Sequence, residues 1–302
     1  MRIAVPDLIS NSYFPAIAAV ELGCLRDEGI DATVELLFPV DATYNALSAG
    51  EIDIVAGSAH SALAAFPDWK GVRLLAAQGQ GMYWFLVMRA DLNIERNDIR
   101  AVRGKKIGAA PWVDLGLQQL VIDAGVPLDE VDIAPVPGAA GAGTNFGLTA
   151  ARALADGKID GFWANGMGAE TAIRSGAGSL VIDVRRGDGP AGCFDYTFAS
   201  IAATEAFINA DSGRAQALVR ALRRAHTLLS EDPQRATEIG ERVFPPEQAA
   251  LIAELVRRDI PYYDAEIPER AISGMKRFAK ERGLLEGDPS YEEIVATDID
   301  RS

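Results

Sequence analysis

The chain contains little cysteine and little histidine, and these shortages exclude several classes of protein. Its 302 residues include two cysteines, Cys24 and Cys193, and two histidines, His60 and His226. Two cysteines so far apart give neither a disulfide framework nor the ligand spacing of a metal site. We therefore expect no metal site, and we assign no cofactor.

A basic surface and a long apolar run are also missing. The 43 acidic residues exceed the 29 basic ones, which gives a net charge of −14. Such a field repels phosphate backbones, so nucleic-acid binding is not expected. No segment approaches the roughly 20 apolar residues that a membrane-spanning helix needs. Apolar residues make up 49% of the chain and charged residues 24%, which is typical of a globular protein large enough for two lobes.

The amino terminus shows no export signal. Residues Met1–Pro6 read directly as a β-strand, without a charged and then apolar segment ahead of it. If the sequence is complete, this predicts a cytoplasmic protein. A mature exported form, or a misplaced start site, has the same appearance.

An internal repeat organises the chain. The segment Ala46–Asp53 (ALSAGEID) recurs as Ala153–Asp160 (ALADGKID). Each copy has the pattern of a helix end, a glycine that stops the helix, and a strand entered through Ile-Asp. Short strands, Arg2–Val5 and Lys106–Ala109, precede the two copies at equivalent places. We interpret this as a duplication of a βαβ-type unit.

The repeat and the runs between its copies predict an α/β protein with two lobes around a ligand cleft. The apolar run Trp84–Met88 is typical of a buried strand leaving the first lobe, and Tyr196–Ile201 of a strand returning to it. The first lobe is expected to comprise residues 1–89 and 196–302, and the second lobe residues 90–195. Alternating strands and helices favour parallel sheets, whose ligand sites lie at the carboxyl ends of the strands.

The last third of the chain has a helical pattern. Asp211 and Ser212 are suitable for capping a helix that places Leu218, Leu222 and Leu229 on one face. A further helix is expected to begin at Pro268. We expect this helical tail to pack on the first lobe.

Several motifs together resemble one family. They are the loop Asn11–Pro15, the segment Leu47–Ile54, the segment Val102–Gly108 and the segment Asp156–Gly161. Over roughly residues 1–240 the chain is similar to the substrate-binding proteins of nitrate, sulfonate, taurine and thiamine-precursor ABC transporters, which have the type II periplasmic-binding-protein-like fold. The resemblance implies a monomer in the cell envelope. It would close two lobes on a small organic ligand, act together with an ABC permease and catalyse no reaction.

In the first lobe, the loops after two strands supply polar candidates. The loops Ser10–Phe14 and Gly57–His60 each lead into a predicted helix, where free N–H groups can hold a carboxylate, a sulfonate or a polarised carbonyl. Ser12 and Ser58 can add hydroxyl groups or simply cap these helices. The candidate ligand-binding residues of the first lobe are Asn11, Ser12, Tyr13, Ser58, His60, Gln80 and Tyr83.

In the second lobe, the candidates are two tryptophans and three polar residues: Trp112, Trp163, Asp114, Asn165 and Asp195. Aromatic rings form rigid walls of ligand sites, although they also fill cores. Asp114 either caps a helix or faces the ligand, where it would repel an anion. No arginine lies in the candidate loops, although Arg185 and Arg186 lie close to Cys193 in sequence. A neutral or weakly charged ligand with an aromatic part therefore fits better than a sulfonate or nitrate.

Two other functions stay open from the sequence. A few relatives in the resembled group are enzymes, but Ser12 stands where a desulfinase nucleophile would be a cysteine, and Gly57 stands where a pyrimidine synthase would have its lysine. A pair of Ser12 and His60 could still act as nucleophile and base, without a third orienting residue. A cytosolic ligand sensor is the other alternative. We assign no catalytic residue, and we interpret Cys24, Cys193 and His226 as structural.

Overall fold

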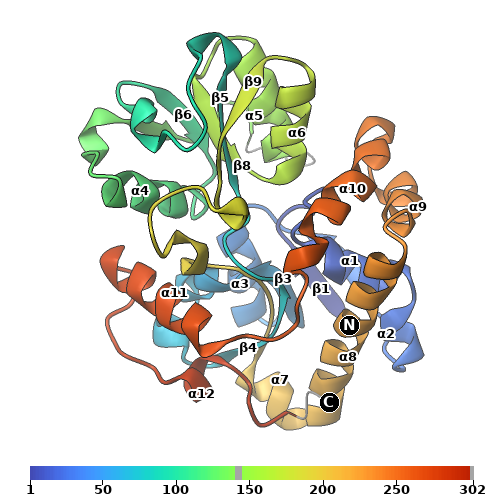
Figure 1. The fold of residues 1–302 in the computed structure, drawn as a ribbon. Helices are drawn as coiled ribbons and strands as arrows, with labels where there is room; N and C mark the ends of the chain where they lie inside the picture. Colours follow the sequence, from blue (N-terminus) through green and yellow to red (C-terminus); the bar gives the residue numbers. More distant parts are fainter. Residues whose placement is uncertain (140–144, 300–302) are drawn as a thin grey trace. The chain divides into compact units, whose positions relative to one another are not determined.

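The computed structural model describes residues 1–139 and 145–299. The chain divides into two compact units, one of Met1–Gly81 with Thr197–Ser302 and the other of Met82–Tyr196. Each unit has its own five-stranded sheet, flanked by helices (Figure 1).

The sheet of the first unit mixes parallel and antiparallel strands. Its order is β2-β1-β3-β10-β4. β1 pairs in parallel with β2 and β3, whereas β10 runs antiparallel to both of its neighbours, with Ala199 opposite Ser58 and Gly79. The strands are β1 (Arg2–Val5), β2 (Thr33–Leu36), β3 (Ile54–Ser58), β4 (Val72–Gly79) and β10 (Ala199–Thr204).

The sheet of the second unit repeats this arrangement, in the order β7-β6-β8-β5-β9. β6 pairs in parallel with β7 and β8, and β5 runs antiparallel to β8 and β9. The strands are β5 (Phe85–Arg89), β6 (Lys106–Ala109), β7 (Asp132–Ala134), β8 (Gly161–Ala164) and β9 (Gly178–Asp183).

The two sheets therefore have the same topology, which confirms the two-lobed α/β fold built by duplication. The sheets combine the expected parallel pairs with antiparallel ones, because the fourth strand in each sheet order comes from a crossing segment and runs against its neighbours. For the same reason, Phe85–Arg89 belongs to the second sheet, and the first unit ends at Gly81 rather than at residue 89.

The helices of the first unit include the whole carboxyl-terminal region. Helix α8 packs against α1 and α2 through a face that contains Leu218, Leu222 and Leu229, and Asp211 caps it by accepting a hydrogen bond from the Arg214 amide at 3.0 Å (Figure 1). The α-helices are α1 (Phe14–Glu21), α2 (Cys24–Asp27), α3 (Val40–Ser48), α7 (Glu205–Ala210), α8 (Ser212–Glu231), α9 (Arg235–Val243), α10 (Pro246–Asp259), α11 (Glu269–Glu281) and α12 (Tyr291–Ile294).

The second unit contains α4 (Asp114–Asp123), α5 (Phe146–Ala155) and α6 (Gly166–Arg174). Helices α5 and α6 approach each other closely, since a Cβ at Gly168 would lie 2.7 Å from the backbone of Gly147. Among the helices of residues 1–139 and 145–299, none is both long and apolar enough to cross a membrane.

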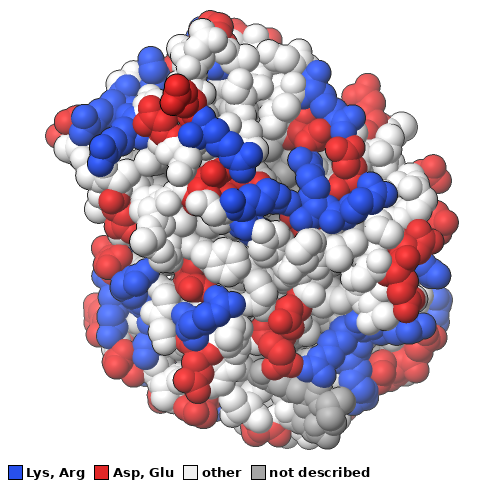
Figure 2. Space-filling view, in the orientation of Figure 1, with Lys and Arg blue, Asp and Glu red and all other residues white. Residues whose placement is uncertain are grey.

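Charged side chains of both signs lie next to one another over the face shown in Figure 2. No cluster of three or more histidine, cysteine or acidic side chains is placed to hold a metal within the described part of the chain.

Candidate functional site

The candidate residues of each unit gather at the edge of its sheet where the parallel strands end. In the first unit, β1 and β3 end there, and the antiparallel β10 starts there. This is the edge at which open α/β sheets bind ligands.

The loop after β1 contains three consecutive buried polar side chains, Ser10, Asn11 and Ser12, of which the last two are each 1% exposed. Asn11 donates from Nδ2 to Oδ2 of Asp259 at 2.5 Å, and its backbone carbonyl accepts a hydrogen bond from the Tyr263 hydroxyl at 2.8 Å. Asn11 Oδ1 and Ser12 Oγ have no hydrogen-bond partner among the described residues. Both oxygens are therefore buried and unpaired within the described part of the chain. Tyr13, the next residue, is also buried.

The start of helix α1 is already capped from within the protein. The backbone N–H of Ala16 donates to Oε1 of Gln78 at 3.2 Å, and Gln78 Nε2 donates to the Ser200 carbonyl at 3.0 Å. The expectation of free N–H groups for an anion is thus wrong for Ala16, because a buried glutamine from β4 occupies this position.

The loop after β3 leads into a 3₁₀ helix, Ala59–Ala64, rather than an α-helix. Its first N–H groups are also occupied, since Ala59 donates to the Phe198 carbonyl at 3.0 Å and His60 to Thr197 Oγ1 at 3.5 Å. Ser58 makes no capping hydrogen bond, and its Oγ lies 2.5 Å from Oγ of Ser61.

His60 is fully buried and firmly held. Its Nδ1 lies 2.9 Å from Thr197 Oγ1, and its ring meets the ring of Phe278 edge-on at 5.5 Å between centroids. The nucleophile–base pair left open by the sequence is not formed, because Ser12 Oγ has no partner among the described residues and His60 Nδ1 is engaged by Thr197.

The carboxyl-terminal helices position this edge of the sheet, which the sequence does not indicate. The side-chain Nε2 of Gln80 donates to the carbonyls of Asp264 and Glu266 at 3.1 and 2.7 Å. Asp259 and Tyr263 reach Asn11 from almost the whole length of the chain away. No local pattern marks either residue, since an acidic residue near a helix end and a loop tyrosine are common on any surface.

The second unit contributes a buried aromatic cluster. The ring of Trp84 lies 4.6 Å from that of Tyr83 and 6.4 Å from that of Trp163, measured between centroids. Trp163 is a residue of β8 rather than of the following loop, and its indole N–H donates to the Val113 carbonyl at 3.1 Å. The cluster forms a rigid apolar wall whose Trp163 N–H is already used by the protein.

Arg185 also belongs to this cluster, although it is not among the ligand-binding residues predicted from the sequence. Its guanidinium lies 5.6 Å above the centre of the Tyr83 ring, within the range of a cation–π contact, and the residue is 5% exposed. Arg185 lies in the short 3₁₀ turn Val184–Arg186, which directly follows β9. The rule that ligands meet strand ends would have found it if Gly178–Asp183 had been recognised as a strand.

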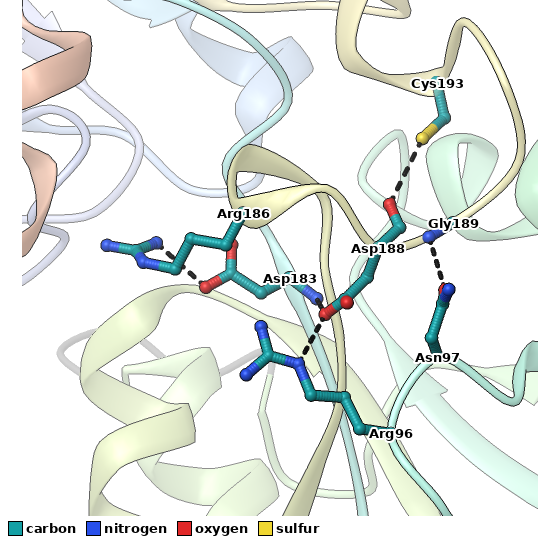
Figure 3. A network of polar contacts seen from close by, with 7 residues as sticks. All are labelled: Arg96, Asn97, Asp183, Arg186, Asp188, Gly189 and Cys193. Atoms are coloured by element: carbon teal, nitrogen blue, oxygen red, sulfur yellow. Dashed lines mark hydrogen bonds and ion pairs between the residues drawn. The ribbon is translucent and has the colours of Figure 1, made fainter.

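A network of polar contacts holds the loop that carries Arg185 (Figure 3). One oxygen of the Asp188 carboxylate, Oδ2, accepts from Arg96 Nε at 2.9 Å and from the Asp183 N–H at 2.8 Å. The other contacts drawn are Arg186 to Asp183 Oδ2, the Gly189 N–H to Asn97 Oδ1 and Cys193 Sγ to the Asp188 carbonyl. The loop after β9 is thus fixed at several points.

The remaining candidates of the second unit have identifiable local roles. Asp114 is the first residue of α4, accepts from Gln118 Nε2 at 2.8 Å, and has its pKa raised by burial. Asn165 caps α6 by accepting from the Gly168 N–H at 2.9 Å. Trp112 has a left-handed backbone, with φ of 67°, which is strained for a bulky residue and is often found at functional sites. Asp195 lies in the short 3₁₀ turn Cys193–Asp195.

Comparison with known proteins gives one family and many similar folds. Residues 10–236 match the family described as "NMT1/THI5 like". The sulfonate ABC transporter periplasmic sulfonate-binding protein SsuA of Methylobacillus flagellatus KT is 18% identical, with a TM-score of 0.67 over 98% of this chain and 90% of that one. The alkanesulfonate-binding protein SsuA of Xanthomonas axonopodis pv. citri, bound to MOPS, is 13% identical, with a TM-score of 0.74 over 99% and 96%.

A third similar structure is a mutant of DSZB in complex with biphenyl-2-sulfinic acid, 15% identical, with a TM-score of 0.66 over 99% of this chain and 97% of that one. No protein of curated function matches the sequence. The periplasmic-binding-protein-like fold expected from the sequence motifs is thereby confirmed.

Proposed function

The chain belongs to the NMT1/THI5-like family, and we propose that it is a binding protein for a small organic solute. The observation that carries the proposal is the pair of consecutive buried side chains, Asn11 and Ser12, whose oxygens have no partner among the described residues at the ligand-binding edge of the first sheet. Buried polar atoms are almost always hydrogen-bonded in folded proteins, and an unpaired one costs about 1–3 kcal/mol. A ligand that pairs with them removes this cost.

We propose that the two units act as lobes that close on the ligand. The first lobe supplies polar contacts from Asn11, Ser12, Tyr13, Ser58, His60 and Gln80, and the second supplies Tyr83, Trp112, Asp114, Trp163, Asn165 and Asp195 together with Arg185. Closure is stabilised only by contacts that the ligand makes in the closed state and not in the open one. The protein would act as a monomer in the cell envelope and deliver the closed form to an ABC permease.

The aromatic cluster supports a ligand with a planar or apolar part. Rings of Tyr83 and Trp84 offer rigid surfaces of this kind. The guanidinium of Arg185 above Tyr83 adds positive charge at the same edge, so an electron-rich ring or a partial negative charge in this part of the ligand is favoured.

The substitution Ser12→Ala tests the proposal. Because Ser12 Oγ makes no hydrogen bond within the described protein, we expect unchanged or slightly higher thermal stability, and about a fivefold to tenfold loss of ligand affinity, the equivalent of about 1 kcal/mol for one hydrogen bond. Ser230→Ala, at an exposed position of α8, is the matched control and should change neither. If the role of Ser12 were only structural, the Ser12→Ala variant would have lower thermal stability and an unchanged ligand affinity.

The ligand for this test comes from native mass spectrometry of the protein purified from its own organism. We expect a small molecule to co-purify and to change the intrinsic fluorescence, since Trp84, Trp112 and Trp163 lie in the second unit. Small-angle X-ray scattering should show a smaller radius of gyration with ligand than without it. An unchanged radius with saturating ligand would exclude closure.

An enzyme on the same scaffold is the second candidate, and the similarity to DSZB favours it. We test it by incubating the protein with biphenyl-2-sulfinic acid and separating the products by chromatography. The unpaired Ser12 Oγ and the raised pKa of the buried Cys193 thiol provide no activated nucleophile at these positions. We therefore expect no turnover, and steady product formation would replace the binding proposal.

A further inference from the structure

The side-chain amide of Asn11 is held in one orientation by a buried carboxylate. Its Nδ2 lies 2.5 Å from Oδ2 of Asp259, the last residue of α10, and both residues are 1% exposed. The NH₂ end of the amide donates to this carboxylate oxygen, and the amide oxygen is therefore the end that points away from it. The flipped amide would bring two acceptor oxygens together. The contact with Asp259 therefore determines which end of the Asn11 amide, nitrogen or oxygen, is left to pair with a ligand.

The backbone at Asn11 is fixed from the same segment. The hydroxyl of Tyr263 donates to the Asn11 carbonyl at 2.8 Å, and the Tyr263 ring stacks on that of His226 at 5.3 Å between centroids. His226 in turn lies 2.9 Å from the Gln78 carbonyl through Nε2. The side chain of Asn11 is thus held by the last residue of α10, and its backbone by a residue that follows this helix.

The end of the amide that remains available is its acceptor oxygen. Asn11 Oδ1 is buried without a partner among the described residues, and the adjacent Ser12 Oγ is in the same condition. A group from outside the chain that pairs with Oδ1 must bring a hydrogen. Ser12 Oγ can donate or accept, so its partner in the ligand can be either an acceptor or a donor.

We propose that Asn11 Oδ1 binds a hydrogen-bond donor of the ligand, and that Asp259 is the positioning residue that sets this polarity. The ligand class is an organic molecule with an amino, amide, hydroxyl or ring N–H group. Sulfonate or carboxylate oxygens at this place would face the Asn11 oxygen, with the Asp259 carboxylate behind it, and are disfavoured. The inference rests on the proposed function, because it assigns the polarity of one part of the same site.

The experiment uses the full chain and a panel of small organic molecules arranged as matched pairs. Each pair is an aromatic amide or sulfonamide and the corresponding acid, for example benzamide with benzoate and benzenesulfonamide with benzenesulfonate. Dissociation constants are measured by calorimetry. We expect the amide of a pair to bind at least about ten times more tightly than the acid, the equivalent of about 1.4 kcal/mol.

Two variants separate positioning from simple contact. Asp259→Asn keeps the shape but allows the Asn11 amide to turn, so the preference for amides should fall about tenfold. The double variant Asn11→Asp with Asp259→Asn exchanges the two groups. The amide at 259 then donates to the carboxylate at 11, an acceptor is again presented to the ligand, and the preference should return. A merely structural role for Asp259 would give no such rescue.

The outcomes are distinct. Binding of the acids in preference to the amides overturns the inference and leaves the proposed function standing. An unchanged preference in a folded Asp259→Asn variant, as judged by circular dichroism, also overturns it. If that variant does not fold, loss of the preference in the folded double variant overturns it instead. If no molecule of either class binds, the proposed function fails together with the inference.

Discussion

The ring of His226 stacks on the ring of Tyr263, with 18° between their planes and 5.3 Å between their centroids. His226 is a residue of α8, and Tyr263 follows α10 and holds the loop of Asn11. Because the imidazole Nε2 faces the Gln78 carbonyl at 2.9 Å, it must carry the hydrogen and donate. Burial lowers the pKa of His226 to about 4, so the ring is neutral at neutral pH.

The stability of the protein should therefore depend on pH through His226. Between pH 6.5 and about 4 the unfolded chain protonates this histidine while the folded chain does not. The free energy of unfolding should fall as the pH falls through this window, by on the order of 3 kcal/mol at about 1.4 kcal/mol per pKa unit. Denaturant titrations of the wild type and of His226→Gln, which keeps a donor for the Gln78 carbonyl, isolate this contribution. Identical pH profiles for the two proteins would contradict it.

The repeat in the sequence was sufficient to predict the fold, but not the exchange of strands between its halves. The segments around Gly50 and Gly157 predict equivalent helix–strand units, and the two sheets have the same strand order. The apolar run Phe85–Arg89 predicts a buried strand, but it does not indicate which of the two sheets this strand joins. Its partners, β8 and β9, lie far along the chain, and pairing of this kind is decided by tertiary packing rather than by local pattern.

The residues of the candidate site are likewise predictable from the sequence only in part. Residues directly after strands, such as Asn11 and Ser12, are predictable because parallel strands end at one edge of a sheet. Asp259 and Thr197 act through partners that are remote in sequence, on Asn11 and His60 respectively. Their chemistry depends on which surface α10 and β10 cover, and no spacing in the sequence encodes that.

Both cysteines should be unreactive in the folded protein. Burial raises the pKa of the Cys193 thiol to about 11 and also raises that of Cys24. The thiolate is the reactive form, so a thiol reagent such as dithionitrobenzoate at pH 8 should label neither at an appreciable rate. Both should react in guanidinium chloride. Rapid labelling of the native wild type, lost in Cys193→Ser, would show an accessible thiol and would revive the enzyme alternative.

The contact between α5 and α6 should not tolerate a side chain at Gly168. A Cβ there would lie 2.7 Å from backbone atoms of Gly147, which cannot move aside as a flexible side chain can. We expect Gly168→Ala to lower the free energy of unfolding by about 1–3 kcal/mol, as overpacking usually does. Gly213→Ala is the control. Its Cβ would meet only the Asp211 carboxylate at 3.3 Å, and it gains helix propensity in α8, so its stability should be equal or higher. Equal effects of the two substitutions would refute this account of the helix contact.

Asp114 should reduce stability while it contributes to binding. Burial raises the pKa of its carboxyl, so the folded protein holds the charged form less well than the unfolded chain does. Its unfavourable effect is present at neutral pH and disappears as the pH falls below the ordinary carboxyl range. Asp114→Asn keeps an acceptor for Gln118 Nε2. It should raise the free energy of unfolding at pH 7 by about 0.5–2 kcal/mol, the usual size of such gains, and the gain should vanish in acid.

If Asp114 also contacts the ligand, as proposed, the same variant should bind more weakly at pH 7 despite its higher stability. Denaturant titration and calorimetry on one preparation measure both effects. Asp129→Asn, at an exposed position outside the candidate site, should leave both unchanged. Higher stability with unaltered affinity would contradict a role of Asp114 in the site, because its half-buried carboxylate would then lower stability without contributing to binding. Lower stability would instead show that its charge favours the first turn of α4, through the helix dipole, by more than burial disfavours it.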